Sequence, residues 1–395
     1  MKEAVIVAAC RTAVGRAPRG TLRLTRPEYM GTEVLKEVIK RTPGLDPLHI
    51  DDVVIGCTFP EAEQGLNLAR VLVAKAGLPD EVPGLTINRF CSSGLNAISI
   101  ACERIMTGQA EIIVAGGVES MSLIPMGGNM MMVDPELGAE KPWAYEGMGM
   151  TAENVANDFH INREDMDALS VRSNELALKA IAEGKFKDEI LPLAVTKQRM
   201  NKKGKYELYE EIFDTDEGPR PGTTMEGLAK LKPAFIKGGS VTAGNSSQTS
   251  DGAAMVMCMS KEKAQEMGLR PLLTYRSFAV AGVDPRYMGI GPVKAIPKAL
   301  KLAGIGVDDL NLIELNEAFA SQALYCVREL GLNLDILNVN GGAIALGHPL
   351  GCTGAKLTTQ LLYEMLRRGS DCRWGLVSMC IGFGMGAAGV FEKEN

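Results

Sequence analysis

The chain contains little histidine, few aromatic residues and no long apolar run. Three of its 395 residues are histidine (His49, His160 and His348), and aromatic residues make up 5%. No two of these histidines can share one face of a helix, so we expect no metal centre built on them. No apolar stretch approaches the ~18 residues that a membrane-spanning helix needs. We therefore expect neither a metal site nor membrane insertion.

Paired cysteines are also missing. The nine cysteines include no Cys-x-x-Cys pair, their number is odd, and several lie in apolar runs. Zinc sites and disulfide frameworks are built on such pairs, whereas single cysteines in apolar surroundings are typical of proteins in a reducing compartment. We therefore expect free thiols and a cytoplasmic location.

The chain has no excess of positive charge. Its formal net charge is −6, and non-specific binding of nucleic acid requires a basic face. We expect no nucleic-acid partner, although a local basic patch for a phosphorylated ligand is compatible with this balance. The apolar run 4–9 is short and lies between Glu3 and Arg11, so it predicts a buried first strand rather than a secretion signal.

Glycine is abundant, with 44 residues. Turns rich in glycine and other small residues occur at the same place in two similar series of elements. The first half is predicted to contain strand 84–88, a glycine turn at 91–94, helix 95–106 and strand 112–116. The second half is predicted to contain strand 336–340, a small-residue loop through residue 354, helix 355–368 and strand 375–379. The shared order of strand, turn, helix and strand indicates duplication of a mixed α/β unit.

Residues 122–250 differ from both halves. They include a polar helical segment at 163–183, a charged stretch at 197–211 and several methionines, among them Met126, Met130, Met131, Met132, Met148 and Met150. No low-complexity linker is present, so we interpret this region as an insertion docked on the core. The predicted units are residues 1–121 with 251–271, the insertion 122–250, and residues 272–395.

Cys91 is the strongest candidate for a reactive residue. It stands at a turn before helix 95–106, which carries almost no charge before Glu103 and is therefore expected in the centre of a layered structure. Backbone N–H groups at the start of such a helix favour a thiolate. The competing interpretation is a buried structural cysteine, which is the one we prefer for Cys102.

Three further positions carry candidate chemistry. His348 lies in a loop of small residues that lets backbone and ligand approach closely, whereas His49 and His160 lie among charged residues and are expected on the surface. Asn316 follows strand 312–315 and is expected to open a helix. The ordinary interpretation is a helix cap, which would not prevent its side chain from also fixing a water molecule near a ligand carbonyl. Cys380 supplies a second thiol beside glycines, so one thiol could carry an acyl group while the other moves a proton.

Residues 384–389 match the dinucleotide-binding pattern G-x-G-x-x-G, but too few residues follow for a βαβ unit. We therefore reject a nucleotide site there. We instead expect these glycines to let backbone N–H groups face a substrate carbonyl.

A series of motifs extends over nearly the whole chain, at residues 88–94, 116–121, 151–155, 241–247, 251–254, 288–293, 316–320, 338–351 and 380–386. In these motifs and their order the sequence resembles the thiolases. The resemblance implies a five-layered α-β-α-β-α sandwich of two similar halves with an inserted loop domain. It also implies an acyltransferase that cleaves 3-ketoacyl-CoA with CoA, with no permanently bound cofactor.

The resemblance also implies a role for each candidate residue. Cys91 would be the acyl-carrying nucleophile, His348 the imidazole that activates it, and Cys380 the general acid and base. Asn316 would hold a water molecule in one oxyanion site with His348, and the N–H groups of Cys91 and Gly382 would form a second.

Coenzyme A is the substrate that the resemblance implies, with acyl-CoA as its partner in the reaction. The residues matched to contacts with it are Arg220, Ser247, Ala243, Met148 and Phe319. A homodimer or homotetramer is implied as well.

Two positions depart from common thiolase patterns. Thiolases specialised for acetoacetyl-CoA commonly carry a histidine where this chain has Gly147, so the chain resembles the broader degradative group. Phe383 stands where three adjacent glycines are common, but Gly382 and Gly384 remain in place. A biosynthetic acetoacetyl-CoA thiolase is the alternative function. A non-catalytic lipid carrier is a further alternative, against which Cys91, Asn316, His348 and Cys380 together argue.

Overall fold

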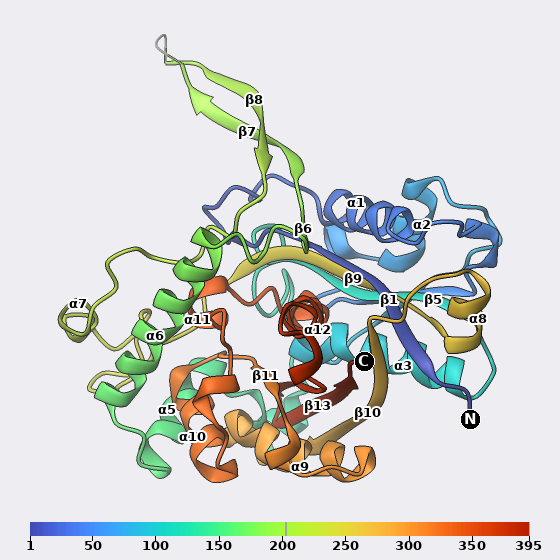
Figure 1. Ribbon diagram of the computed structural model, residues 1–395. Coiled ribbons are helices and arrows are strands. Elements are labelled where there is room, and N and C mark those ends of the chain that lie inside the picture. Colours follow the sequence, from blue (N-terminus) through green and yellow to red (C-terminus); the bar gives the residue numbers. More distant parts are fainter. Residues whose placement is uncertain (202–203, 395) are drawn as a thin grey trace.

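Five layers stack in the order helices, sheet, helices, sheet, helices in the computed structural model, which describes residues 1–201 and 204–394 (Figure 1). The first sheet has the strand order β4 (Leu85–Ile87), β3 (Asp52–Gly56), β5 (Ile112–Ser120), β9 (Ser250–Ser260) and β1 (Ala4–Thr12). The second has the order β10 (Leu273–Gly282), β13 (Met385–Glu392), β12 (Trp374–Ile381) and β11 (Leu312–Leu315). A short antiparallel pairing of β1 with β10 joins the two sheets.

The alternation of side chains along β1 shows how the layers are held together. Val5 and Val7 face an outer core, whereas Ala4 and Ile6 face the core between the sheets. Helices α1 (Pro27–Lys40) and α2 (Leu68–Ala76) cover the outer face of the first sheet, and α9 (Gly291–Ala303) and α10 (Ala320–Leu330) cover that of the second. Because both faces of each sheet are covered, the whole of β1, β5 and β9 is buried. The predicted buried first strand and five-layered fold are thus confirmed.

The middle layer consists of α3 (Ser93–Met106) and α12 (Leu350–Arg367), which contact each other through glycine. A Cβ atom on Gly354 would lie 2.2 Å from the backbone nitrogen of Leu95, and one on Gly94 would lie 2.8 Å from that of Ala355. The two backbones therefore touch where the helices begin. The residues that precede α3 and α12 are brought close together as a result.

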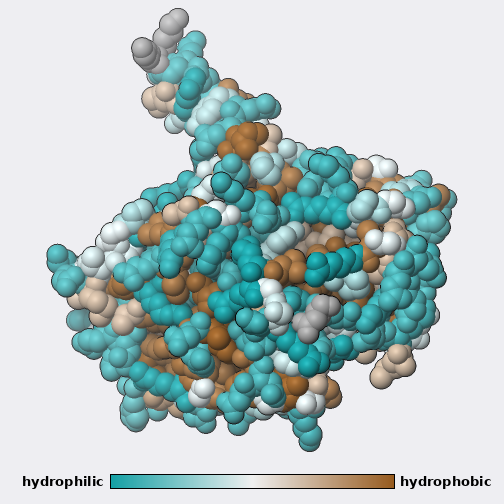
Figure 2. Space-filling view, in the orientation of Figure 1, coloured by the Kyte–Doolittle hydropathy of each residue, from teal (hydrophilic) through white to brown (hydrophobic). Residues whose placement is uncertain are grey.

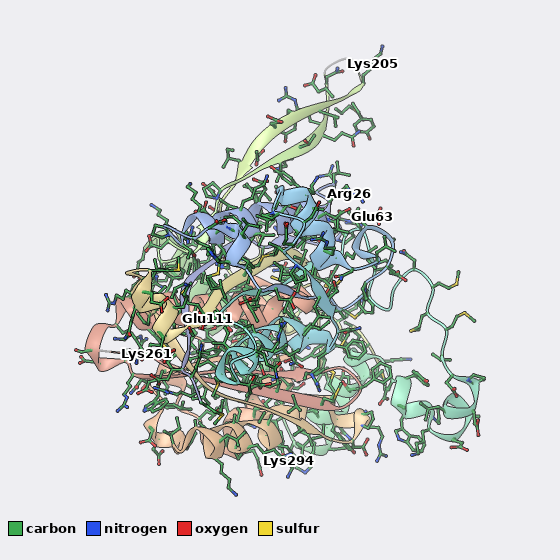
Figure 3. All side chains as sticks on the ribbon, turned by 90° about the vertical axis from the view of Figure 1, so that its right-hand side faces the viewer. Arg26, Glu63, Glu111, Lys205, Lys261 and Lys294 are labelled. Atoms are coloured by element: carbon green, nitrogen blue, oxygen red, sulfur yellow. The ribbon has the colours of Figure 1, made fainter. Side chains whose placement is uncertain are left out.

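Between β5 and β9 the chain runs largely outside the two sheets. This stretch holds α4 (Pro135–Glu140), α5 (Met148–Asp158), α6 (Arg163–Ala182), β7 (Leu193–Met200), β8 (Tyr206–Phe213) and α7 (Met225–Ala229). Strands β7 and β8 form a hairpin that projects from the body, with Lys205 near its end (Figures 1 and 3). Figure 2 shows hydrophilic residues over most of this hairpin and of the face in view. No helix in the described part of the chain is both long and apolar enough to cross a bilayer. The division into three units remains a prediction.

Shorter elements complete the chain. They are β2 (Gly15–Arg16), which pairs with β9, β6 (Ile190–Leu191), which pairs with β1, α8 (Lys261–Glu266) and α11 (Ala343–Leu346).

Two predicted elements of the second half are wrong. No strand forms at 336–340, because Asn338 has a positive φ of 47° and its side-chain amide bonds the N–H and the carbonyl of Leu315. A 3-10 turn at Leu334–Ile336 and a single bridge between Ile313 and Leu337 stand there instead. The helix predicted from residue 355 begins at Leu350, because its small residues serve the contact with α3 rather than a loop.

The close contact of α3 and α12 makes a testable prediction for Gly354→Ala. The added methyl group would overlap the backbone of Leu95, and overpacking of this kind costs about 1–3 kcal/mol, more than the gain of about 1 kcal/mol in helix propensity. We expect a lower melting temperature of the whole protein, measured by calorimetry. Gly138→Ala in α4 is the matched control, since a Cβ there meets nothing within 4 Å. Equal melting temperatures for Gly354→Ala and the wild type would contradict the account.

Candidate active site

A pocket of about 460 Å³ lies where the starts of α3 and α12 meet the stretch between β5 and β9. Cys91 and His348 both line it, and most of the other lining side chains are apolar. They include Met121, Met148, Met288, Phe235, Phe319 and Leu350. The arrangement combines a thiol and an imidazole in surroundings suited to an apolar ligand.

A rigid turn before α3 positions Cys91. The side-chain carbonyl of Asn88 accepts from the N–H of Phe90 at 2.8 Å, and the hydroxyl of Ser93 donates to the carbonyl of Phe90 at 2.7 Å. The N–H of Arg89 donates to that hydroxyl at 2.8 Å. Phe90 itself has a φ of 44°, a strained conformation that neighbouring contacts must hold in place.

Two backbone N–H groups, from different halves of the fold, point at the sulfur of Cys91. They are those of Gly382 and of Cys91 itself. Burial raises the pKa of the Cys91 thiol to about 11, and these two N–H groups partly offset that rise. The thiol is therefore neutral at rest, while the N–H groups can stabilise an anion that forms beside it.

Hydrogen bonds fix the tautomer of His348. The hydroxyl of Thr353 donates to the carbonyl of Pro349 at 2.9 Å, so it must accept from Nδ1 of His348, which lies 2.5 Å away. The proton is therefore on Nδ1, and Nε2 carries the free lone pair. The side-chain nitrogen of Asn316 lies 3.3 Å from Nε2 and can donate to it.

Burial lowers the pKa of His348 to about 3, and the charge of the nearby buried Lys356 contributes to this. The imidazole is thus neutral at ordinary pH, and its basic nitrogen is available for a proton.

Asn316 does not cap a helix, so that interpretation is wrong. Helix α10 begins four residues later, at Ala320, and Phe319 occupies the capping position. Asn316 is fully buried, and its side-chain oxygen has no hydrogen-bond partner among the described residues. A buried unpaired amide oxygen is costly, and a water molecule or ligand group beside His348 would satisfy it.

Cys380 approaches the site from the second sheet. It lies near the end of β12, fully buried, and it packs with Met288 and Ala318, which line the pocket. Burial raises the pKa of this thiol, and the neighbouring thiol of Cys91 raises it further. Two neutral thiols and a neutral imidazole therefore lie together beside a largely apolar pocket.

The residues matched to coenzyme A contacts divide into two groups. Met148, Ser247 and Phe319 line the pocket. Arg220 and Ala243 are exposed and lie outside its lining.

The structure also places the remaining residues that the sequence analysis discussed. Gly147 lines the pocket, and a Cβ there would meet nothing within 4 Å. His49 and His160 are exposed and Cys102 is fully buried, which confirms their predicted surroundings.

Three residues of the site were not identified as site residues from the sequence. Thr353 orients His348, Lys356 places a buried positive charge near it, and Met288 lines the pocket beside Cys380. Thr353 could have been found if the start of α12 had been placed correctly, because its position in the first turn faces back toward His348. Among residues 1–201 and 204–394, no group of three or more His, Cys, Asp or Glu side chains is placed to hold a metal ion.

Phe383 follows Gly382 in the turn between β12 and β13. Its φ is 64°, in the region that glycine favours. Its ring stacks on that of Phe90 at 5.4 Å with 12° between the planes, and the ring of Tyr145 meets it edge-on at 5.7 Å. The stack thus joins the turn that holds Cys91 to the turn that holds Gly382.

Family comparison covers almost the entire chain. Residues 4–262 match the thiolase N-terminal domain, and residues 269–393 match the thiolase C-terminal domain. The 3-ketoacyl-CoA thiolase of Bacillus subtilis (strain 168) is 56% identical over 392 residues, which are 99% of this chain and 100% of the relative. The peroxisomal 3-ketoacyl-CoA thiolase 5 of Arabidopsis thaliana is 48% identical, covering 98% of this chain and 85% of the relative.

Proteins named for a different activity are similar as well. The acetyl-CoA acetyltransferase of Syntrophomonas wolfei is 46% identical, with 99% of both chains covered. The crystal structure of the acetyl-CoA acetyltransferase of Bacillus anthracis superposes with a TM-score of 0.89 at 41% identity, covering 100% of this chain and 99% of that one.

The fold and the full-length matches define an acyltransferase enzyme. The chain belongs to the thiolase family. The family inferred from the sequence motifs is thereby confirmed, whereas the roles of individual residues remain predictions.

The stack of Phe383 on Phe90 makes a prediction about stability. Phe383→Ala removes the stack and keeps a side chain at positive φ, whereas Phe383→Gly removes the stack and relieves the strain. We therefore expect Ala to destabilise the protein by about 1 kcal/mol more than Gly. Melting temperatures of the two variants would test this. Equal stability, or a more stable Ala variant, would show that the turn is not strained.

Proposed function

We propose that the protein cleaves 3-ketoacyl-CoA with CoA, giving acetyl-CoA and a shortened acyl-CoA, and that it also catalyses the reverse condensation. The observation that carries the proposal is the position of Cys91. Its thiol lies in an apolar pocket with His348, and N–H groups from both halves are directed at the sulfur.

In the first half-reaction, Nε2 of His348 takes the proton of Cys91 as the sulfur attacks the 3-keto carbon. The bond between C2 and C3 of the substrate then breaks, and its electron pair remains on C2 of the departing acetyl-CoA. Cys380 donates a proton to that carbon and is left as a thiolate. The remaining acyl group is bound to Cys91 as a thioester.

In the second half-reaction, the thiolate of Cys380 removes the proton of an incoming CoA thiol. The CoA sulfur attacks the acyl carbon on Cys91, and the sulfur of Cys91 leaves and recovers its proton from His348. Each positioned proton transfer contributes about 10²–10⁴-fold to the rate. Both thiols and the imidazole end in their starting protonation states.

Two groups of donors are placed to hold the oxygens that become negative. A water molecule held by Asn316, together with His348, would serve the 3-keto oxygen, which fits the unpaired side-chain oxygen of Asn316. The N–H groups of Cys91 and Gly382 would serve the thioester oxygen. The loss of one donor of this kind typically lowers kcat about 10²–10³-fold.

The degradative activity is favoured over acetoacetyl-CoA synthesis by the pocket beside Gly147. Methionine side chains line it, and unbranched Met can repack around ligands of different length. Relatives named 3-ketoacyl-CoA thiolase agree with this choice. Relatives named acetyl-CoA acetyltransferase support the biosynthetic alternative.

A non-catalytic lipid carrier is the weaker candidate. Such a carrier has no need for a fixed histidine tautomer next to a thiol and two converging N–H groups.

Coenzyme A would reach Cys91 through the pocket along Met148, Ser247 and Phe319. Arg220 and Ala243, which are exposed beyond the pocket lining, would contact its outer part. No permanently bound cofactor is required by this scheme.

The expected location and assembly are part of the proposal. All nine cysteines are free thiols, which suits the reducing cytoplasm. A homodimer or homotetramer is supported by β4, which ends the first sheet and exposes Leu85 to 39%, and by exposed methionines at positions 126 and 130–132.

The role of Cys91 is tested by acyl labelling. We expect Cys91→Ala to abolish thiolysis and to prevent transfer of an acyl group to the protein, because Cys91 lines the pocket with His348 whereas Cys380 lies behind Met288 and Ala318. Mass spectrometry after mixing with a 3-ketoacyl-CoA should find the group on the peptide that holds Cys91. Cys102→Ala is the control and should label normally. Acyl transfer to Cys380 in the wild type would reverse the assignment of the two thiols.

The substrate range is tested at Gly147. We expect kcat/KM of the wild type to hold or rise from C4 to C8 substrates, since each buried CH₂ can contribute up to about 0.8 kcal/mol. Gly147→His should reduce kcat/KM for the C8 substrate more than for acetoacetyl-CoA, because the imidazole would occupy open space in the pocket.

Gly138→His, outside the pocket lining, is the control and should leave both values unchanged. If the wild type turned over only the C4 substrate, the biosynthetic alternative would replace the degradative one.

A further inference from the structure

A second pocket, which we call the cationic pocket, lies between the chain after β2 and the hairpin. Its volume is about 540 Å³, and Arg16, Arg19, Arg23, Lys197 and Glu217 line it. It shares no lining residue with the catalytic pocket. Its volume lies within the usual range for small-molecule sites, about 300–1,000 Å³.

The positive charges of this pocket are largely unpaired. Arg11 and Arg26, which flank the same stretch of sequence, each have carboxylate partners. Arg16, Arg19 and Arg23 have no ion pair within residues 1–201 and 204–394. The formal net charge of the whole chain is −6, so three free guanidinium groups in one concave site form a local positive field.

Glu217 organises the pocket without neutralising it. Its carboxylate accepts from the N–H of Arg16 at 2.7 Å, and from the N–H and the hydroxyl of Thr21 at 2.8 Å each. A Cβ on Gly20 would lie 1.9 Å from Glu217 Oε1, so this approach requires glycine. The backbone that carries the arginines is therefore fixed before any ligand binds.

The lining chemistry identifies the class of ligand. Ala17 and Pro18 are the only apolar side chains of the lining, so the pocket offers little surface to an acyl chain. Guanidinium groups bind phosphate oxygens through paired, charge-assisted hydrogen bonds. Lys197 of β7 adds a further positive charge. Its Nζ also forms an ion pair with Oε1 of Glu211 at 3.2 Å.

We propose that the cationic pocket binds a small anion carrying two or more phosphoryl groups. The phosphates belong either to CoA itself or to a free nucleotide or pyrophosphate. The two pockets share a wall, since the N–H of Ala17 donates to the carbonyl of Thr249 at 3.0 Å and Thr249 lines the catalytic pocket. An anion in the cationic pocket therefore lies one residue layer from the catalytic pocket.

Pyrophosphate is the probe that tests this proposal, by isothermal titration of the full-length protein at low salt. We expect one site per chain, and a dissociation constant raised about 10-fold or more by Arg19→Ala or Arg23→Ala, because each removes a charge-assisted contact. Arg270→Ala is the matched control. This arginine is also exposed, without an ion pair among the described residues and outside the pocket, so its loss should leave binding unchanged.

A second titration identifies the source of the phosphates. If pyrophosphate raises the dissociation constant of CoA in proportion to its own concentration, the site belongs to CoA. If CoA binds equally well with pyrophosphate present, the site serves a separate anion.

Absence of pyrophosphate binding to the wild type would overturn the proposal. Binding that survives both arginine substitutions would also overturn it. Because the experiment measures binding and not turnover, Cys91→Ala protein should give the wild-type result whether or not the proposed function holds.

Discussion

The contact between α3 and α12 is closer than side chains of ordinary size allow, and the site depends on it. Gly94 and Gly354 let the two backbones touch at the points where the helices begin. The turn before α3 carries Cys91, and the loop before α12 carries His348. Because each helix belongs to a different half of the fold, the contact places residues nearly 260 positions apart in one pocket. A wider separation of the helices would move the imidazole away from the thiol.

Burial of the reactive side chains sets the chemistry of the pocket. Burial keeps the thiols of Cys91 and Cys380 protonated and the imidazole of His348 neutral. The reacting groups of such a site carry no charge until substrate arrives, and each charge then develops next to a prepared donor. The N–H groups of Cys91 and Gly382 and the amide of Asn316 are such donors. They are worth more in this pocket than in water, because the surrounding dielectric is low.

Much of the fold could be predicted from the sequence, and the remainder required tertiary contacts. Apolar strands and the uncharged helix after Cys91 were placed correctly, since local patterns encode burial on both faces. The start of α12 was misplaced because Gly351 and Gly354 have low helix propensity, and only their contacts with neighbouring backbone explain them. The false strand at 336–340 has a similar cause, since the side chain of Asn338 bonds the backbone of a strand distant in sequence.

Proton transfer by Cys380 is the central claim, and hydrogen exchange at the α-carbon of acetyl-CoA tests it most directly. Cys380→Ser protein, incubated with acetyl-CoA in deuterium oxide, should still acylate slowly at Cys91 but incorporate no deuterium at the α-carbon. The equally buried Cys326→Ser in α10 is the control and should exchange normally. Exchange at the wild-type rate in Cys380→Ser would contradict the account and assign the proton to another group.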